Sequence, residues 1–263
     1  MILDKIAAAT RARIAEDMIK IPLEAMIEMA EQRNKDTGFP FEAALKKGDI
    51  HFICEVKKAS PSKGVIAESF PYVEIAREYE KAGASCVSVL TEPAFFLGSD
   101  SYLTEIKDTI HLPVLRKDFI LEPYQIYQAK AIGADCILLI CSLLEEETIR
   151  EYIRLCDSLG LSALVEAHDE EEVAAAVRAG ARLLGVNNRN LKTFEVDILN
   201  SKRLRRLVPE DILFVAESGI QSPEDINTLR KAKVNAVLIG ETLMRSKDKK
   251  KMLEELRGSY DKN

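Results

Sequence analysis

The sequence lacks several features that would mark particular classes of protein. Its 263 residues include no Trp and three His, which show no spacing typical of a catalytic triad or a metal site. Its five Cys form no CxxC pair, so we expect buried, reduced thiols rather than disulfides or zinc ligands. Because 37 Lys and Arg stand against 43 Asp and Glu, broad nucleic-acid binding is disfavoured, although a local site for a small phosphorylated ligand is not.

Long apolar runs are also missing. Charged residues interrupt the N-terminal stretch MILDKIAAATRARIAED, which therefore has no signal-peptide core. No segment approaches the ~18 uninterrupted apolar residues that suggest a membrane-spanning helix. We therefore expect a cytoplasmic protein with no membrane or nucleic-acid partner, and reduced thiols suit that compartment. We expect a monomer, with a homodimer as the alternative.

What the sequence does contain is a repeated unit, in which a short apolar run precedes a charged segment of helical period that ends in Gly. The nearly continuous apolar runs are typical of strands that are buried on both faces. The eight candidate strands are residues 52–57, 86–90, 114–117, 136–140, 163–166, 183–187, 213–217 and 236–239. Helical patterns between them include residues 72–82, 123–132, 145–159, 170–179 and 223–232, several of which close at a C-cap glycine such as Gly83, Gly133 or Gly180.

This alternation predicts an α/β fold, a closed (β/α)8 TIM barrel, formed as a single domain over residues 1–263. A doubly wound open sheet is the alternative, but it would be expected to carry a GxGxxG loop after its first strand, and none is present. Residues 1–48 precede the first strand and show two amphipathic helix patterns on either side of Ile21-Pro22. We expect them to form an N-terminal helical extension that is packed on the barrel, with apolar contacts from Ile6, Ile14, Met18, Leu23, Met26, Ile27 and Met29.

Polar side chains close nearly every apolar strand, and such residues are costly to bury unless they are paired or used. In a barrel of this kind, functional residues gather where the strands end. The candidates are Glu55, Lys57, Lys117, Glu166, Asn187, Glu217 with Ser218 and Gly219, and Gly240. Glu55 and Lys57 lie two residues apart and therefore share one face of the first strand. They form either an inward pair that also reaches an anionic ligand, an outward pair on the helix-facing side, or a structural salt bridge at the barrel mouth.

Lys117 and Glu166 are candidates for proton transfer. We expect partial burial and neighbouring positive charge to lower the pKa of Lys117, and desolvation to raise that of Glu166, so that the pair supplies an acid and a base. A plain salt bridge that closes the barrel is the alternative. His168 lies one step beyond the strand, and we expect it at the surface or capping a helix.

Two glycine-containing loops suggest a phosphate site. Gly219 follows the seventh strand and Gly240 the eighth, which are the positions where such barrels often bind phosphate through backbone N–H groups.

Seven motifs along the chain resemble those of the indole-3-glycerol phosphate synthase family. The most specific is EVKKASPSKG at residues 55–64, and the match runs from the N-terminal extension to the last strand. The others are TEPAFFLGS at 91–99, LRKDF at 115–119, LVE at 164–166, NNRNL at 187–191, AESGI at 216–220 and GETLM at 240–244.

The resemblance implies a carbon–carbon lyase (a carboxy-lyase) of tryptophan biosynthesis that needs no metal or organic cofactor. Its substrate would be 1-(o-carboxyphenylamino)-1-deoxyribulose 5-phosphate, which it would close, decarboxylate and dehydrate to indole-3-glycerol phosphate. By resemblance Lys117 is the general acid, Glu166 the second proton-transfer group, and Lys57 the partner of the substrate carboxylate and of Glu55. Asn187 and Glu217 resemble supporting polar groups. The implied binding residues are Ser60, Ser218, Gly219, Gly240 and Glu241 for phosphate, Phe96, Phe119, Leu138 and Leu191 as apolar walls, and Arg189.

Two rival interpretations remain open. Phosphoribosylanthranilate isomerase is similar in its phosphate loops, but it lacks a long N-terminal extension and relies on a Cys and an Asp where this chain offers Glu55 and Lys57. A barrel that binds a phosphorylated ligand without catalysis would not need Lys57, Lys117 and Glu166. The resemblance also places the N-terminal extension over the mouth of the active site, where it would exclude water.

Overall fold

The computed structural model describes residues 2–46, 48–190 and 193–258, and eight of its strands form a closed barrel. Each strand pairs in parallel with its neighbours, and β1 closes the ring by pairing with both β4 and β10. The barrel strands are β1 (His51–Val56), β4 (Cys86–Leu90), β5 (Val114–Lys117), β6 (Cys136–Ile140), β7 (Ser162–Ala167), β8 (Leu183–Asn187), β9 (Leu213–Glu217) and β10 (Ala236–Ile239). The predicted TIM barrel is confirmed, and no predicted strand boundary is off by more than one residue.

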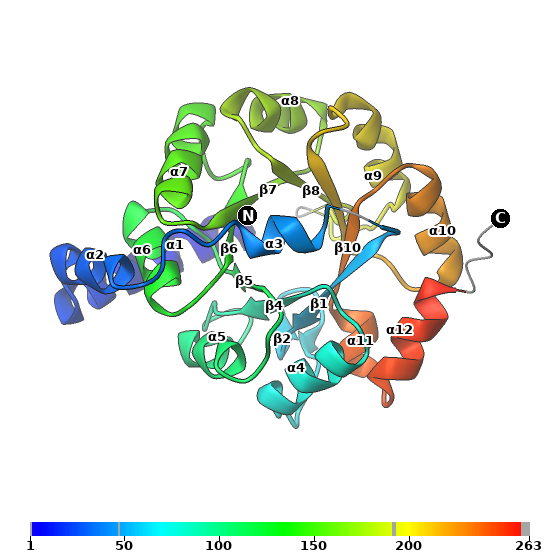
Figure 1. Cartoon of the computed structure of the whole chain (residues 1–263), viewed down its shortest axis with the longest axis horizontal. Helices are drawn as coiled ribbons and strands as arrows, with labels where there is room; N and C mark the ends of the chain where they lie inside the picture. Colours follow the sequence, from blue (N-terminus) through cyan, green and yellow to red (C-terminus); the bar gives the residue numbers. More distant parts are fainter. Residues whose placement is uncertain (1, 47, 191–192, 259–263) are drawn as a thin grey trace.

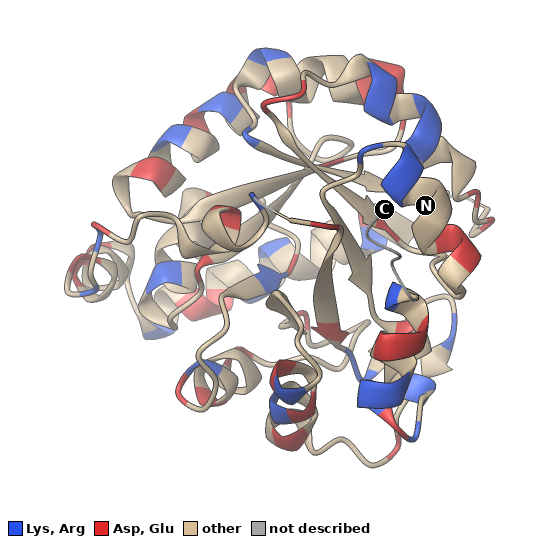
Figure 2. Ribbon diagram, turned by 45° about the vertical axis from the view of Figure 1, so that its right-hand side comes forward, with Lys and Arg blue, Asp and Glu red and all other residues tan. Residues whose placement is uncertain are grey.

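Helices surround the barrel, as Figure 1 shows. They are α4 (Tyr72–Lys81), α5 (Asp100–Lys107), α6 (Pro123–Ala131), α7 (Glu146–Ser158), α8 (Glu170–Ala179), α9 (Leu199–Leu204) with the 3-10 turn η1 (Arg205–Leu207), α10 (Pro223–Lys231), α11 (Glu241–Arg245) and α12 (Lys249–Arg257). Figure 2 shows that charged positions lie mainly on these helices, whereas the strands are largely uncharged. Among the described helices, none is both long and apolar enough to cross a membrane.

The core has two layers because successive strand residues point to opposite faces of the sheet. Along β6, Leu138 belongs to the cluster inside the barrel, whereas its neighbours Ile137 and Leu139 belong to the larger cluster between strands and helices. The predicted buried thiols fit this packing: four of the five Cys are buried, Cys141 is half-buried, and all five are free.

The N-terminal extension begins with two helices, α1 (Ile2–Lys20) and α2 (Leu23–Glu31). Ile14 and Met26 pack with Tyr124 and Ala131 of α6, and Figure 1 shows α2 outside the ring beside α6. The predicted contact from Met18 is wrong, because this side chain is 38% exposed on the outer face of α1. Met29 is likewise exposed at 43%, since Ala30 rather than Met29 faces the barrel side of α2.

A salt bridge fixes α1 to the barrel. Arg13 donates from Nη2 to both carboxylate oxygens of Asp118 at 2.9 Å, and Asp118 follows β5 directly. Asp118 is fully buried, and it also accepts hydrogen bonds from Thr91 and Arg116. Charge-assisted hydrogen bonds of this kind, here from one guanidinium nitrogen to both carboxylate oxygens, are stronger than neutral ones. The first helix is therefore anchored next to the end of β5.

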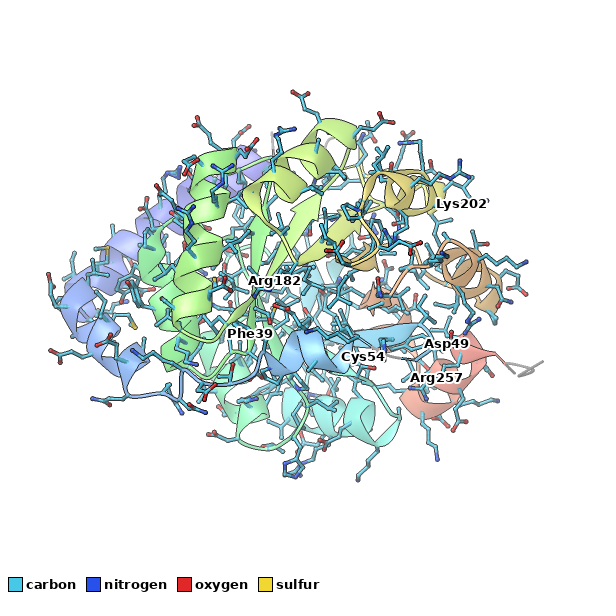
Figure 3. The ribbon with its side chains drawn as sticks, turned by 45° about the horizontal axis from the view of Figure 1, so that its top comes forward. Phe39, Asp49, Cys54, Arg182, Lys202 and Arg257 are labelled. Carbon is cyan, nitrogen blue, oxygen red and sulfur yellow. The ribbon has the colours of Figure 1, made fainter. Side chains whose placement is uncertain are left out.

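The sequence did not predict the third helix of the extension, α3 (Pro40–Ala44). Phe41 and the following Leu45 are buried in the inner cluster together with the first residues of several strands, so α3 closes the amino-terminal end of the barrel. The buried Glu42 pairs with Arg182 at 2.9 Å, and the Arg182 guanidinium lies over the ring of Phe39. Figure 3 shows these last two side chains next to each other at this end.

Candidate active site

A cavity of about 600 Å³ lies at the carboxyl end of the barrel, a volume typical of small-molecule sites. Fifteen of the sixteen predicted site residues line it, and the sixteenth, Leu191, lies outside the described residues. The fifteen are Glu55, Lys57, Ser60, Phe96, Lys117, Phe119, Leu138, Glu166, Asn187, Arg189, Glu217, Ser218, Gly219, Gly240 and Glu241. The structure therefore brings together residues from every part of the chain that the sequence had singled out.

Lys117 lies at the centre of the polar groups in this cavity. Its Nζ donates to Glu217 Oε2 at 2.6 Å and to Glu166 Oε2 at 3.0 Å. Asn187 Nδ2 donates to the other oxygen of Glu166 at 3.3 Å. Lys117 and Glu217 end strands β5 and β9, Glu166 is the last residue but one of β7, and their inward orientation follows from strand alternation. One ammonium therefore donates hydrogen bonds to two buried carboxylates.

The protonation pattern of this cluster differs from the sequence prediction. Burial disfavours the Lys117 ammonium, but Glu217, Glu166 and Glu55 outweigh it and raise the pKa, so the predicted lowering is wrong. For Glu166, burial is outweighed by Lys117 and His168, and the pKa falls to about 2, again opposite to the prediction. For Glu217, burial and the neighbouring Glu166 prevail over Lys117 and raise the pKa to about 7. The cluster thus contains a protonated amine, an ionised carboxylate and a carboxyl that holds a proton close to neutral pH.

Gly185 provides the space that Glu217 occupies. A Cβ atom on Gly185 would lie 2.3 Å from Glu217 Oε1. Strand β8 therefore requires glycine beside the carboxylate, and any larger residue would displace the Lys117 partner. Sequence reasoning missed this residue, although a glycine inside an otherwise apolar strand often marks a close approach of this kind.

Glu55 and Lys57 form the predicted inward pair. Their carboxylate and ammonium are in direct contact and both line the cavity, so the outward-facing alternative is wrong. A Cβ on Gly240 would lie 2.3 Å from Glu55 Oε1 and 2.8 Å from Lys57 Nζ. Gly240 therefore makes room for this ion pair, a role in addition to the phosphate contact that its position predicted.

The loop after β9 is a candidate anion-binding turn. Ser218 and Gly219 both have left-handed backbones, with φ of 67° and 83°. Asn188 supports the loop, because its Nδ2 donates to Ser218 O at 3.1 Å while its Oδ1 accepts from the hydroxyl of Ser201. Turns in which successive backbone N–H groups converge form concavities that bind anions, which makes this loop a candidate phosphate site.

Glu241 could contribute to phosphate binding only through its N–H group. Its carboxylate is 3.6 Å from Lys63 Nζ and 3.1 Å from Arg245 Nε, and an anion would repel it. Lys63 follows Ser60 in a hairpin of β2 (Ala59–Ser60) and β3 (Gly64–Val65), which the sequence did not predict. Both cations line the cavity and were missed as candidate residues.

Apolar side chains line another part of the cavity. The rings of Phe96 and Phe119 lie 6.0 Å apart, and Leu138 also lines the wall. Ile2 and Leu3 of α1 extend this lining, which places the start of the N-terminal extension at the mouth of the cavity. An aromatic ring would be shielded from water between these groups.

His168 was expected at the surface or capping a helix, and the structure places it directly before the N-cap of α8, where its N–H donates to Glu172. Its side chain is 17% exposed, with Nε2 at 3.5 Å from Glu166 Oε1 and Nδ1 at 3.0 Å from Glu172 Oε2. It does not line the cavity but lies behind Glu166. Burial lowers the pKa of His168, but Glu172, Glu166 and Glu217 outweigh it and the net pKa is raised. The residue is therefore part of the site's charge network rather than a surface group.

Within the described part of the chain, no group of three or more His, Cys, Asp or Glu side chains is arranged to hold a metal ion. The groups available for chemistry are those of the side chains themselves: ammonium and carboxyl groups for proton transfer, backbone N–H groups for an anion, and apolar walls for a ring.

Comparison with known proteins gives a consistent result. The family model "Indole-3-glycerol phosphate synthase" matches residues 3–256. A protein of that name from Ruminiclostridium cellulolyticum is 60% identical over 259 residues, covering 98% of this chain and 100% of its own length. One from Endomicrobium trichonymphae is 54% identical, covering 98% and 100%. Among solved structures, 3-hexulose-6-phosphate synthase from Salmonella typhimurium superposes with a TM-score of 0.65 at 15% identity, over 79% of this chain and 96% of its own, and so shares the fold alone.

Proposed function

Starting from the fact that this chain belongs to the indole-3-glycerol phosphate synthase family, we propose that the cavity around Lys117 is its active site and that Lys117 is the general acid. The enzyme is a carboxy-lyase of tryptophan biosynthesis. It closes 1-(o-carboxyphenylamino)-1-deoxyribulose 5-phosphate to indole-3-glycerol phosphate, with release of carbon dioxide and water.

In the first step, the ring carbon that bears the carboxylate attacks the ketone carbon of the sugar. The ketone oxygen gains electrons as the new carbon–carbon bond forms, and it needs a proton. Lys117 supplies it, because its ammonium lies in the cavity and is kept charged by Glu166 and Glu217. The same ammonium stabilises negative charge on that oxygen before the proton moves.

The later steps restore aromaticity. Carbon dioxide leaves the ring carbon that made the new bond, and the electrons of the broken carbon–carbon bond return to the ring. The new hydroxyl then departs as water with a proton from an acid, and a base removes a proton from the methylene next to nitrogen. Glu166 is our candidate for that base, since it is the carboxylate of the cluster that is ionised at neutral pH. Glu217 and Asn187 hold Lys117 and Glu166 in place.

The two ends of the substrate bind to different parts of the cavity. We assign the phosphate to backbone N–H groups of Ser218, Gly219, Gly240 and Glu241, together with Ser60. We assign the substrate carboxylate to Lys57, which is paired with Glu55. The aromatic ring lies among Phe96, Phe119 and Leu138, and Arg189 lines the same cavity. Holding both ends brings the reacting carbons together, which alone can contribute several kcal/mol to catalysis.

The observation that carries this proposal is the placement of one ammonium between two buried carboxylates in a cavity with a phosphate-type loop. The test is to incubate purified protein with the substrate and to follow indole absorbance and carbon dioxide release. Both should appear together and in equal amounts, and Lys117→Ala should abolish both. Binding without turnover would instead support a non-catalytic barrel.

We further propose that the enzyme works in the cytoplasm as a monomer and as a single domain that includes residues 1–48, without nucleic-acid partners. The net charge of -6 supports the last point. Light scattering should give a mass close to 29.4 kDa, and a value near twice that would favour the homodimer.

A further inference from the structure

His168 is fixed by contacts on several sides. Its backbone N–H donates to Glu172 Oε2 at 2.8 Å, and its ring Nδ1 lies 3.0 Å from the same oxygen. Its carbonyl accepts from Asn200 Nδ2 of α9 at 3.0 Å. The remaining ring nitrogen, Nε2, is buried and faces Glu166 Oε1 at 3.5 Å. The imidazole therefore links the first turn of α8 to the carboxylate at the end of β7.

This geometry favours a doubly protonated ring, although Nε2 makes no hydrogen bond to a described residue and its contact with Glu166 is electrostatic. A neutral imidazole carries one N–H donor and one lone pair. Both ring nitrogens of His168 face carboxylate oxygens, so a neutral ring would direct a lone pair at one of two anions. The imidazolium has a donor for each. The raised pKa of His168 agrees, because Glu172, Glu166 and Glu217 outweigh the effect of burial.

The charges around the ring can be counted from the elements that face it. Glu166 comes from β7, Glu172 from α8 and Glu217 from β9, while Asn200 is uncharged. Cys141 lies beside Glu172 and Glu166, but burial raises the pKa of its thiol to about 12, and it stays neutral. Lys117 is the other cation and is shared between Glu166 and Glu217.

Resting on the proposed function, we propose that His168 is a positioning residue that stays an imidazolium and selects Glu166, rather than Glu217, as the ionised carboxylate beside Lys117. Lys117 alone cannot make that selection, because it bonds to both carboxylates. The second cation, His168, lies behind Glu166, and it is within direct contact distance of Glu166 but not of Glu217. Glu166 is therefore ionised and can accept a proton from the substrate. Two carboxyls this close together keep one proton between them, and that proton lies on Glu217.

The protonation state can be measured on the intact enzyme. The chain has three His, so nitrogen-15 spectra of the imidazoles at several pH values resolve each ring, and His168→Gln identifies one of them. We expect His168 to carry protons on both nitrogens at pH 7 and to titrate above the ~6.5 of a free imidazole. A singly protonated His168 at pH 7 would overturn the proposal. This measurement needs no turnover, so its failure is distinct from failure of the proposed reaction.

The second part of the proposal, that His168 determines which carboxylate is ionised, is tested by the pH dependence of kcat. His168→Gln keeps an amide donor next to Glu166 but removes the charge, and His111→Gln is the matched control. We expect kcat to fall roughly tenfold with little change in KM, a part of the ~10²–10⁴-fold that proton transfer contributes. The limb of the profile near pH 7 should move upward by about one pH unit, because loss of a cation raises the apparent pKa of the carboxylate pair.

Two results would contradict an effect of His168 on the carboxylate pair. The first is a His168→Gln profile that superposes on that of the control while circular dichroism shows both variants folded. The second is a downward shift of the limb. Glu172→Gln provides an independent check, since removing the partner of Nδ1 should lower the pH at which His168 titrates in the nitrogen-15 spectra. An unchanged titration in that variant would refute the role of Glu172.

Discussion

Replacing Lys117 by Met separates the two tasks of its ammonium. Methionine keeps a long apolar side chain in the inner barrel but can neither donate a proton nor neutralise Glu166 and Glu217. We expect turnover to fall by ~10²-fold or more, which is the contribution of a general acid. The variant should still bind inorganic phosphate, because the loop after β9 does not depend on the ammonium.

The same substitution should change stability in a way that depends on pH. Glu166 and Glu217 are 5% and 2% exposed, and without Lys117 they share no cation. An uncompensated buried charge costs about 3–5 kcal/mol, and uptake of a proton relieves part of it. Both carboxyls would then have folded-state pKa values above the unfolded value of about 4.3, so the stability they contribute is present below that pH and is lost as pH rises.

The stability gap between the variant and the parent should therefore be small at pH 5 and grow to about 3 kcal/mol at pH 8. For a chain of this size that gap corresponds to roughly 6–12 °C in the thermal midpoint. Circular dichroism melts at four pH values measure it, and indole absorbance measures turnover. Lys202→Met is the control, since Lys202 is exposed at the edge of the molecule in Figure 3.

Two outcomes would refute this reasoning. Near-parental turnover in Lys117→Met would remove Lys117 from the chemistry. A stability gap that stays constant or narrows toward pH 8 would show that the two carboxylates do not depend on the ammonium for their charge.

Three further predictions concern binding. In Gly219→Ala the added Cβ would lie 2.3 Å from Val196 Cγ1, at a φ of +83° that disfavours alanine. Steady-state kinetics should therefore show KM raised at least about tenfold. An unchanged KM would exclude the loop from the phosphate site. Deleting residues 1–34 removes Ile2 and Leu3 from the cavity mouth and should raise KM about tenfold in a barrel that circular dichroism shows to be folded; unchanged affinity would contradict a role as a lid. Inorganic phosphate should inhibit competitively, and noncompetitive inhibition would point to a different anion site.

The strands and most of the site could be predicted because local signals were strong. Each strand is a largely apolar run, several have a polar residue at or next to the carboxyl end, and in a barrel those ends converge. Lys117, Glu166 and Glu217 were therefore predictable as neighbours, although they are 49 and 100 residues apart along the chain.

The parts that could not be predicted depend on contacts between distant segments. Helix α3 spans five residues, too few for a periodic pattern, and it is stabilised by its place in the inner barrel. The direction of the Lys117 and Glu166 pKa shifts depends on how many carboxylates surround one ammonium. His168 looked like a surface residue because strand alternation stops at the end of β7, and its contact with Glu172 depends on how α8 begins.

The wrapping of the N-terminal extension around the barrel also has a consequence for the growing chain. The partners of this first-made segment are made much later: Asp118 follows Arg13 by 105 residues, and Arg182 follows Glu42 by 140. At a synthesis rate of ~5–20 residues per second, Glu42 waits roughly 7–28 s for Arg182 to be made. During that interval the packing around Phe41 is incomplete, because its cluster also contains Leu183, Leu213 and Ala236, which are made still later. On the ribosome, the N-terminal extension therefore reaches its final packing only after the last strands of the barrel have been made.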